Sequence, residues 1–227
     1  MSCGVPDRIA TAAAVVCAVA LAVVVVVLGV ENPPTPRPVS TDSLGPDAGE
    51  PVADYLARAA VTLDEAAVDG ADSDPRWGLV TFDDEVTATD ADALTGDVRI
   101  SQVWFRVPID RVQTPIVPVG VAGAESVARA SGLAAAQLHG TTGEWDRQAR
   151  VDAVSAWRLT QDCACVVAVT VRAPLSELAA LSDVAGVRSV ESLPADAVFG
   201  RFAVRPLLPE QTEAVTPGPD DGEVPER

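Results

Sequence analysis

Residues 165–191, CVVAVTVRAPLSELAALSDVAGVRSVE, decide the fold of this chain, because they hold a strand, a helix and a second strand in succession. The β-branched run from Cys165 to Val171 is typical of a buried strand. Ser176 to Leu181 predicts a helix, with Ser176 as its N-cap. After Gly186, Val187 to Val190 predicts the next strand.

A second unit with the same pattern lies 89 residues earlier in the chain. It contains a predicted strand at Leu79–Phe82, a helix over Thr87–Thr95 and a strand from Val98 to Val107. The two units span about 77–107 and 164–192. Each leaves one face of its strands to bury, so the two side by side predict a four-stranded sheet with both helices on one face. The sequence therefore predicts an α+β domain of the ferredoxin-like arrangement.

The second unit also resembles a known family. Its strand Val169–Val171, its helical segment Leu175–Leu181 and its segment Gly186–Glu191 are similar to the propeptide-like inhibitor domains of subtilisin-type proteases. The resemblance covers about 30 of 227 residues. It implies a ferredoxin-like fold and, as an alternative function, inhibition of a secreted serine protease.

The segment between the two units predicts an inserted strand, helix and strand. Pro115–Val119 is extended, Ala124–Leu138 is Ala-rich and helix-like, and Val151–Leu159 is expected to be a strand that pairs with Cys163–Val171. Upstream of both units, the apolar spacing within Val52–Val68 predicts a helix that packs on the sheet or on the insert.

The N-terminal region predicts a membrane anchor. Ile9 to Val30 is 22 residues long and holds no charged side chain. At about 1.5 Å per residue, such a helix spans the hydrocarbon core of a bilayer. A cleaved signal peptide is the competing interpretation. Arg8 precedes the helix, so the positive-inside rule favours a cytoplasmic N-terminus and an extracytoplasmic remainder.

The composition divides the rest of the chain into regions. Residues 1–8 are expected to form a short cytoplasmic tail before the anchor, and 31–51 contain six prolines, which predicts a semi-rigid stalk. The folded domain is expected at 52–208. Residues 209–227 hold four prolines, six acidic residues and no aromatic residue, so we expect an acidic, disordered tail.

The charge balance excludes several classes of function. The chain has 33 acidic residues, 16 arginines and no lysine, and its net charge of −17 argues against a nucleic-acid partner. Arginine without lysine indicates a GC-rich, bacterial genome. There is one histidine, His139, and no recognisable hydrolase, zinc or phosphate-binding motif. The sequence therefore predicts a non-enzyme with no cofactor and no metal.

Cys163 and Cys165 form the most unusual local feature. On a strand, residues two apart point to the same face, so the two sulfurs would be neighbours. Buried thiols, a structural disulfide, a redox-active pair and a metal site remain open.

These features predict a single-pass membrane protein of the cell envelope. Its extracytoplasmic domain is expected to act without catalysis, by contact with an envelope protein. The alternatives are a protease inhibitor and a thiol-redox protein that uses Cys163 and Cys165.

Overall fold

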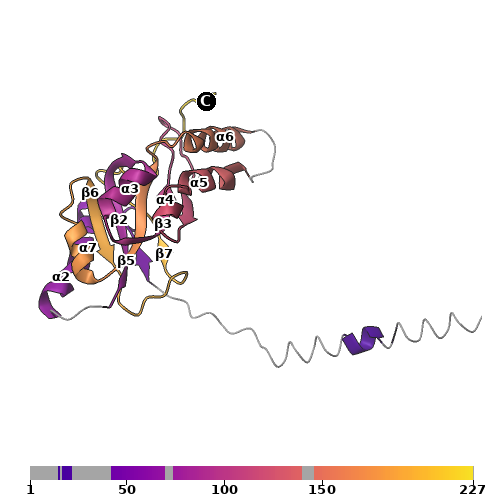
Figure 1. Ribbon diagram of the computed structural model, residues 1–227. Coiled ribbons are helices and arrows are strands. Elements are labelled where there is room, and N and C mark those ends of the chain that lie inside the picture. Colours follow the sequence, from indigo (N-terminus) through magenta and orange to yellow (C-terminus); the bar gives the residue numbers. More distant parts are fainter. Residues whose placement is uncertain (1–14, 16, 22–41, 70–73, 140–145, 227) are drawn as a thin grey trace, which may run out of the picture. The chain divides into compact units, whose positions relative to one another are not determined.

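A five-stranded sheet organises the chain from Asp42 onward in the computed structural model (Figure 1). The structure describes residues 15, 17–21, 42–69, 74–139 and 146–226. The strand order is β4-β3-β5-β2-β6, and every neighbouring pair is antiparallel. The strands are β2 (Arg76–Val86), β3 (Arg99–Phe105), β4 (Val117–Gly120), β5 (Val166–Ala173) and β6 (Val187–Ser192). The predicted mixed α+β class is confirmed.

The two predicted strand–helix–strand units are present, and they interleave. Helix α3 (Ala88–Thr95) connects β2 to β3, and α7 (Leu175–Leu181) connects β5 to β6. The first strands of the two units pair at the centre of the sheet, where Val80 is the partner of Val169. These two strands carry the longest apolar runs, so both take positions that are covered on either face. Buried residues of both connecting helices belong to one core cluster, as expected for helices on the same face.

The ends of these helices follow from local chemistry. Thr87 caps α3, since its side-chain oxygen accepts a hydrogen bond from the Asp90 N–H at 3.1 Å. Gly96, with a φ of 59°, ends that helix. For α7 the predicted cap is wrong: Pro174 occupies the N-cap, and the helix begins at Leu175, one residue before Ser176.

The insert differs from the prediction in its second half. Strand β4 extends the sheet beyond β3, and helices α4 (Ala124–Val127) and α5 (Ala130–His139) follow. The predicted strand at 151–159 is instead part of helix α6 (Arg147–Thr160). Its buried residues recur with helical spacing: Val151, Asp152, Val154, Ser155, Ala156 and Leu159. Asp146 caps the helix by accepting from the Ala149 N–H at 2.9 Å.

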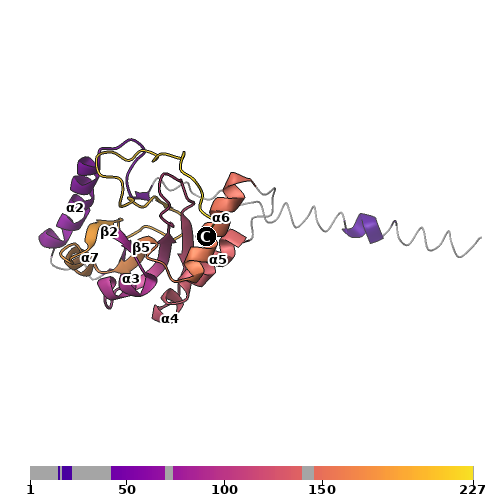
Figure 2. The same ribbon diagram turned by 90° about the horizontal axis from the view of Figure 1, so that it is seen from above.

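Helix α2 (Val52–Asp69) confirms the predicted upstream helix and lies along the outer edge of β6. The Ser192 N–H donates to the Thr62 side-chain oxygen at 2.8 Å. A helix beside an edge strand covers backbone N–H and C=O groups that could otherwise pair with a strand of another chain. Figure 2 shows α2 at one side of the sheet and α5 and α6 at the other.

The second face of the sheet is covered by segments from both ends of the domain. Strand β1 (Ser43–Leu44) pairs in parallel with β7 (Ala203–Val204). Leu44 packs there with Leu79 and Trp104 in a separate apolar cluster. Residues 43–51, predicted to be part of the stalk, therefore belong to the folded unit.

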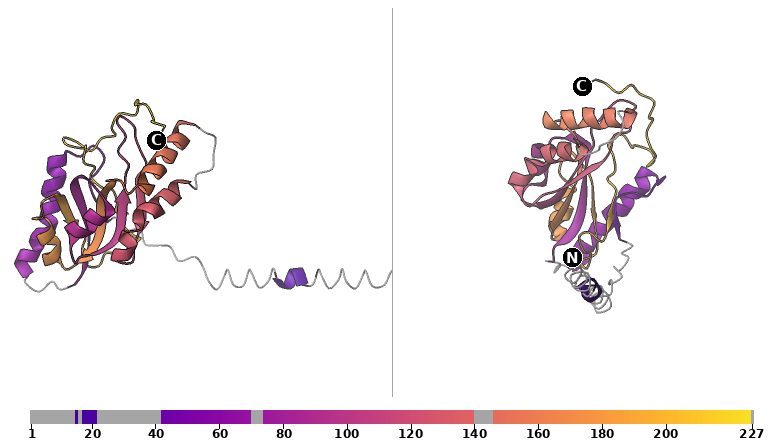
Figure 3. Two further views of the ribbon diagram at one scale, coloured as in Figure 1. Left: turned by 45° about the horizontal axis from the view of Figure 1, so that its top comes forward. Right: turned by 90° about the vertical axis from the view of Figure 1, so that its right-hand side faces the viewer.

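The C-terminal segment also differs from the prediction. Within 209–226, Val215 and Val224 are buried, and the segment runs past the strand ends toward α6 (Figure 3). Asp221 pairs with Arg111 at 2.6 Å, and Asp220 pairs with Arg147 at 3.0 Å. The predicted disorder is wrong for these residues, because composition does not reveal the surface that a segment will meet.

The predicted anchor, Ile9 to Val30, falls largely outside the described residues, although residues 15 and 17–21 are helical. Among the residues that the structure describes, no helix has the length and apolar character needed to cross a bilayer.

Candidate functional site

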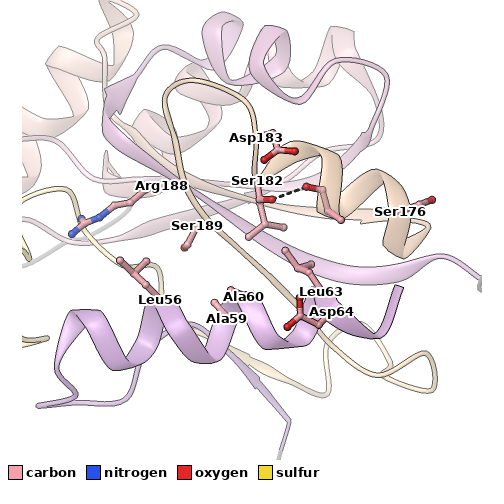
Figure 4. Close-up of a pocket in the computed structure, with 12 residues that line it drawn as sticks. Leu56, Ala59, Ala60, Leu63, Asp64, Ser176, Ser182, Asp183, Arg188 and Ser189 are labelled. Carbon is pink, nitrogen blue, oxygen red and sulfur yellow. Dashed lines mark hydrogen bonds between the residues drawn. The ribbon is translucent and has the colours of Figure 1, made fainter. Parts of the chain in front are cut away.

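A groove of about 620 Å³ lies between α2 and α7, with β6 beneath it (Figure 4). Twelve residues line it: Leu56, Ala59, Ala60, Leu63 and Asp64 of α2; Ser176, Ala179, Ser182 and Asp183 in and after α7; and Arg188, Ser189 and Val190 of β6. These three segments are far apart in the sequence, and the fold alone brings them together.

Small side chains create the groove. Alanine faces it from both helices, at Ala59 and Ala60 on α2 and at Ala179 on α7. A methyl group reaches too little across the gap to fill it, whereas larger side chains would interdigitate. The two helices can therefore cover neighbouring parts of the sheet and still leave a channel between them.

A buried hydroxyl network lies in the floor of the groove. The Ser189 and Thr81 hydroxyls lie 2.6 Å apart, and both residues are buried. The Tyr55 hydroxyl of α2 lies 3.5 Å from the Ser189 oxygen. Burial raises the pKa of Tyr55 well above its ordinary range, so this hydroxyl stays protonated and available as a donor.

An ion pair fixes α2, and with it one wall of the groove. Arg58 donates to Glu191 at 2.7 Å and also pairs with Glu50 at 3.1 Å. The Gly45 N–H donates to the other oxygen of Glu191 at 2.5 Å. Burial raises the pKa of Glu191, and the Gly45 N–H and Arg58 oppose that shift. The hydrogen bond from Arg58 lowers the pKa of Glu50.

The rim of the groove is acidic and rich in hydroxyl groups. Asp64 and Asp183 lie on opposite walls, and the Ser182 hydroxyl donates to the Ala179 carbonyl at 2.6 Å. Arg188 contributes only the aliphatic part of its side chain to the lining, since its guanidinium extends away from the groove (Figure 4). That guanidinium donates to the carbonyls of Leu208, Pro209 and Gln211. The alanines of the two walls, between two carboxylates, suit an apolar side chain flanked by a positive charge.

Cys163 and Cys165 are joined by a disulfide, with their Cα atoms 5.3 Å apart. They lie in the turn between α6 and β5 instead of on the predicted strand, which begins only at Val166. Cys165 is buried and Cys163 is partly buried against the same core. Thiol–disulfide exchange needs access to a sulfur, so this burial favours a structural role.

The other residues considered from the sequence do not gather into a site. His139 ends α5, and its Nδ1 lies 2.7 Å from the Ala135 carbonyl oxygen. Within the described ranges, no three His, Cys, Asp or Glu side chains are grouped so that they could hold a metal ion. Ile9 and Val30, the predicted bounds of the anchor, lie outside those ranges.

The sequence interpretation missed the groove. Leu56, Ala59 and Leu63 carry the helical spacing that predicts α2, but the same spacing is typical of any amphipathic helix. Nothing local marks the alanines of α2 and α7 as facing each other.

Comparison of the chain with protein-family models, with curated proteins and with solved structures finds no match.

Proposed function

We propose that this chain is a single-pass envelope protein whose extracytoplasmic domain binds a partner protein in the groove between α2 and α7. The observation that carries the proposal is the groove itself, with a hydrogen-bonded floor and walls of small side chains. The membrane anchor at Ile9–Val30 remains the sequence-based part of the proposal.

The chemistry of the groove indicates the kind of partner. Asp64 and Asp183 would attract a basic side chain, and the strip formed by Ala59, Ala60 and Ala179 would accept an apolar one. The net charge of the whole chain, −17, would steer a basic partner toward the domain. We therefore infer a partner segment that presents an apolar side chain next to Arg or Lys.

The test uses a photo-crosslinking amino acid at position 60 of the full-length protein in its native envelope. Ala60 lines the groove, and Ala57 is another exposed alanine of α2 that does not. We expect a defined adduct with one protein from position 60 and none from position 57. Asp183→Arg should abolish that adduct, because it reverses the charge of one wall. Adducts that are the same at both positions, or that persist in the Asp183 variant, would reject the groove as the binding site.

We also propose that the sheet is of the ferredoxin-like type. Its support is the order β3-β5-β2-β6 of the four strands that belong to the two units. The connecting helices α3 and α7 pack into one core cluster on the sheet. Strand β4 and helices α4 to α6 would then be an elaboration at one edge of that sheet.

Protease inhibition is the second candidate function. The observation that favours it is the segment β5–α7–β6, which has the strand–helix–strand order of the inhibitor domains that its sequence resembles. The measurement is the rate of a subtilisin-type protease on a chromogenic substrate with the protein at micromolar concentration. An unchanged rate across several such proteases would remove this candidate.

A further inference from the structure

A cluster of aromatic rings stands on the surface of the domain at the start of β2. Trp77 lies 4.9 Å from Phe199 and 6.0 Å from Phe202, centroid to centroid, and the two phenylalanines are 6.1 Å apart. Phe199 is 46% exposed, and Val198 beside it is 50% exposed. We call Trp77, Val198, Phe199 and Phe202 the aromatic patch.

The patch combines apolar rings with arginine. The guanidinium carbon of Arg172 lies 5.2 Å from the centre of the Trp77 ring, and Arg201 is exposed between Phe199 and Phe202 in the sequence. Aromatic rings with nearby cationic side chains are typical of the boundary between lipid and water. There the rings are removed from water while the charged groups remain solvated.

The path of the chain places this patch beside the N-terminal exit of the domain. The Ala203 N–H donates to the Asp42 carbonyl at 3.1 Å, and Ser43 is the partner of Ala203 in the β1–β7 pair. The chain therefore leaves the described domain next to the segment that carries Phe199 and Phe202. Asp42 is the first described residue of that domain, and everything before it leads toward the N-terminus.

The connection to the predicted anchor is short. Residues 31–41 separate Val30 from Asp42, and eleven residues extend at most about 40 Å. If residues 9–30 span a bilayer, the exit point of the domain stays within that distance of the membrane surface. A patch at the exit point meets the lipid far more often than any surface elsewhere on the domain.

We propose that the aromatic patch rests on the membrane, with Phe199 and Val198 inserted among the lipid headgroups. The segment that carries Phe199 and Arg201 also holds Asp196, and Asp42 lies beside Ala203, so its charges are mixed in sign and the apolar side chains would supply the attraction. The occupant is therefore a lipid bilayer surface, and a zwitterionic lipid is sufficient. This orientation rests on the proposed membrane anchor and restricts how the domain stands above the bilayer.

The test uses the full chain reconstituted in phosphatidylcholine vesicles, with and without brominated acyl chains, which quench tryptophan at short range. Trp145 and Trp157 are replaced by Phe, so that emission comes from Trp77 and the buried Trp104. We expect brominated lipid to quench this emission. Phe199→Asp should reduce the quenching at least about twofold, since a carboxylate would replace the exposed apolar ring that the lipid removes from water.

Val61→Asp is the matched control, because Val61 is an exposed apolar residue of α2 outside the patch. It should leave the quenching unchanged, and an unchanged thermal midpoint shows that each variant is folded. Equal quenching in the Phe199 and Val61 variants, or no quenching in the parent, overturns the inference. So does a dimer that depends on Phe199, since a second copy would then cover the patch.

Extraction of the same vesicles with alkaline carbonate separates the two proposals. A chain that is released has no integral anchor, and then the membrane part of the proposed function fails. A chain that stays in the vesicle without quenching of Trp77 rejects only the patch.

Discussion

The Arg58 guanidinium and the Glu191 carboxylate lie 2.7 Å apart and join the middle of α2 to β6. The side chain of Glu191 is 3% exposed, whereas that of Arg58 is 43% exposed. The pair therefore lies at the boundary between core and solvent, where one partner has lost its water and the other has not. Its chief effect is to satisfy a buried carboxylate, which is costly to leave without donors.

Arg58→Ala should lower the free energy of unfolding by about 1–3 kcal/mol, less than for a fully buried pair because Arg58 is partly solvated. Urea denaturation of the wild type and the variant measures this difference. Arg129→Ala is the control, since its pair with Glu125 spans 3.9 Å and is exposed. That variant should change stability by less than about 0.5 kcal/mol. Equal effects of the two substitutions would contradict this role of Glu191.

Glu191 and Glu50 should make opposite contributions to the pH dependence of the free energy of unfolding. The pKa of Glu191 is raised in the folded state above its ordinary 4.5, so the folded state holds its proton more tightly than the unfolded chain. Stability from this group therefore increases as the pH falls from neutral through the raised pKa toward 4.5. The Glu191→Gln variant should lack that increase, as shown by denaturation at several pH values.

Glu50 should behave in the opposite way. Its pKa is lowered from 4.5, mainly by the hydrogen bond from Arg58, so its contribution is present above 4.5 and disappears as the pH falls through the lowered pKa. The stability difference between wild type and Glu50→Gln should therefore shrink in acid. A difference that grows in acid would show that the Arg58–Glu50 bond does not persist in solution.

The disulfide between Cys163 and Cys165 should make a modest contribution to stability. It closes a loop of three residues, for which the chain-entropy relation gives about 1.5 kcal/mol. Replacing both cysteines by Ala should lower the free energy of unfolding by about that amount. Alkylation and mass spectrometry of the native protein should find neither cysteine modified unless a reductant is added. A pair that cycles freely with a glutathione buffer would instead support the redox alternative.

Val224 should hold the C-terminal segment on α6. It is 8% exposed and packs with Val112, Val151 and Val154. Val224→Asp buries a carboxylate there, and we expect a loss of about 2 kcal/mol locally and release of the segment. Limited proteolysis should then cleave after residue 209 much faster than in wild type. Val198→Asp, at a half-exposed valine, is the control and should not change the cleavage rate.

Much of the secondary structure could be predicted because it rests on local pattern. The apolar runs around Val80 and Val169 predict strands whatever surrounds them, and these two residues, which the 89-residue repeat equates, are partners across the sheet. Helix α2 was equally visible from its spacing. The error at 151–159 arose because Val151 and Val154 fit a strand by composition, while their spacing fits the buried face of a helix.

The sequence by itself determined which segments are apolar enough to be buried, and hence the α+β class and the two strand–helix–strand units. Only the tertiary structure decided that Ala60 and Ala179 line one groove, that Asp220 meets Arg147, and that Ala203, next to Phe202, lies beside Asp42 at the N-terminal exit. The physical reason is that hydropathy and its periodicity are properties of a few consecutive residues along the chain. A groove, a docked tail or a surface patch depends on residues that become neighbours only when the whole sheet has closed.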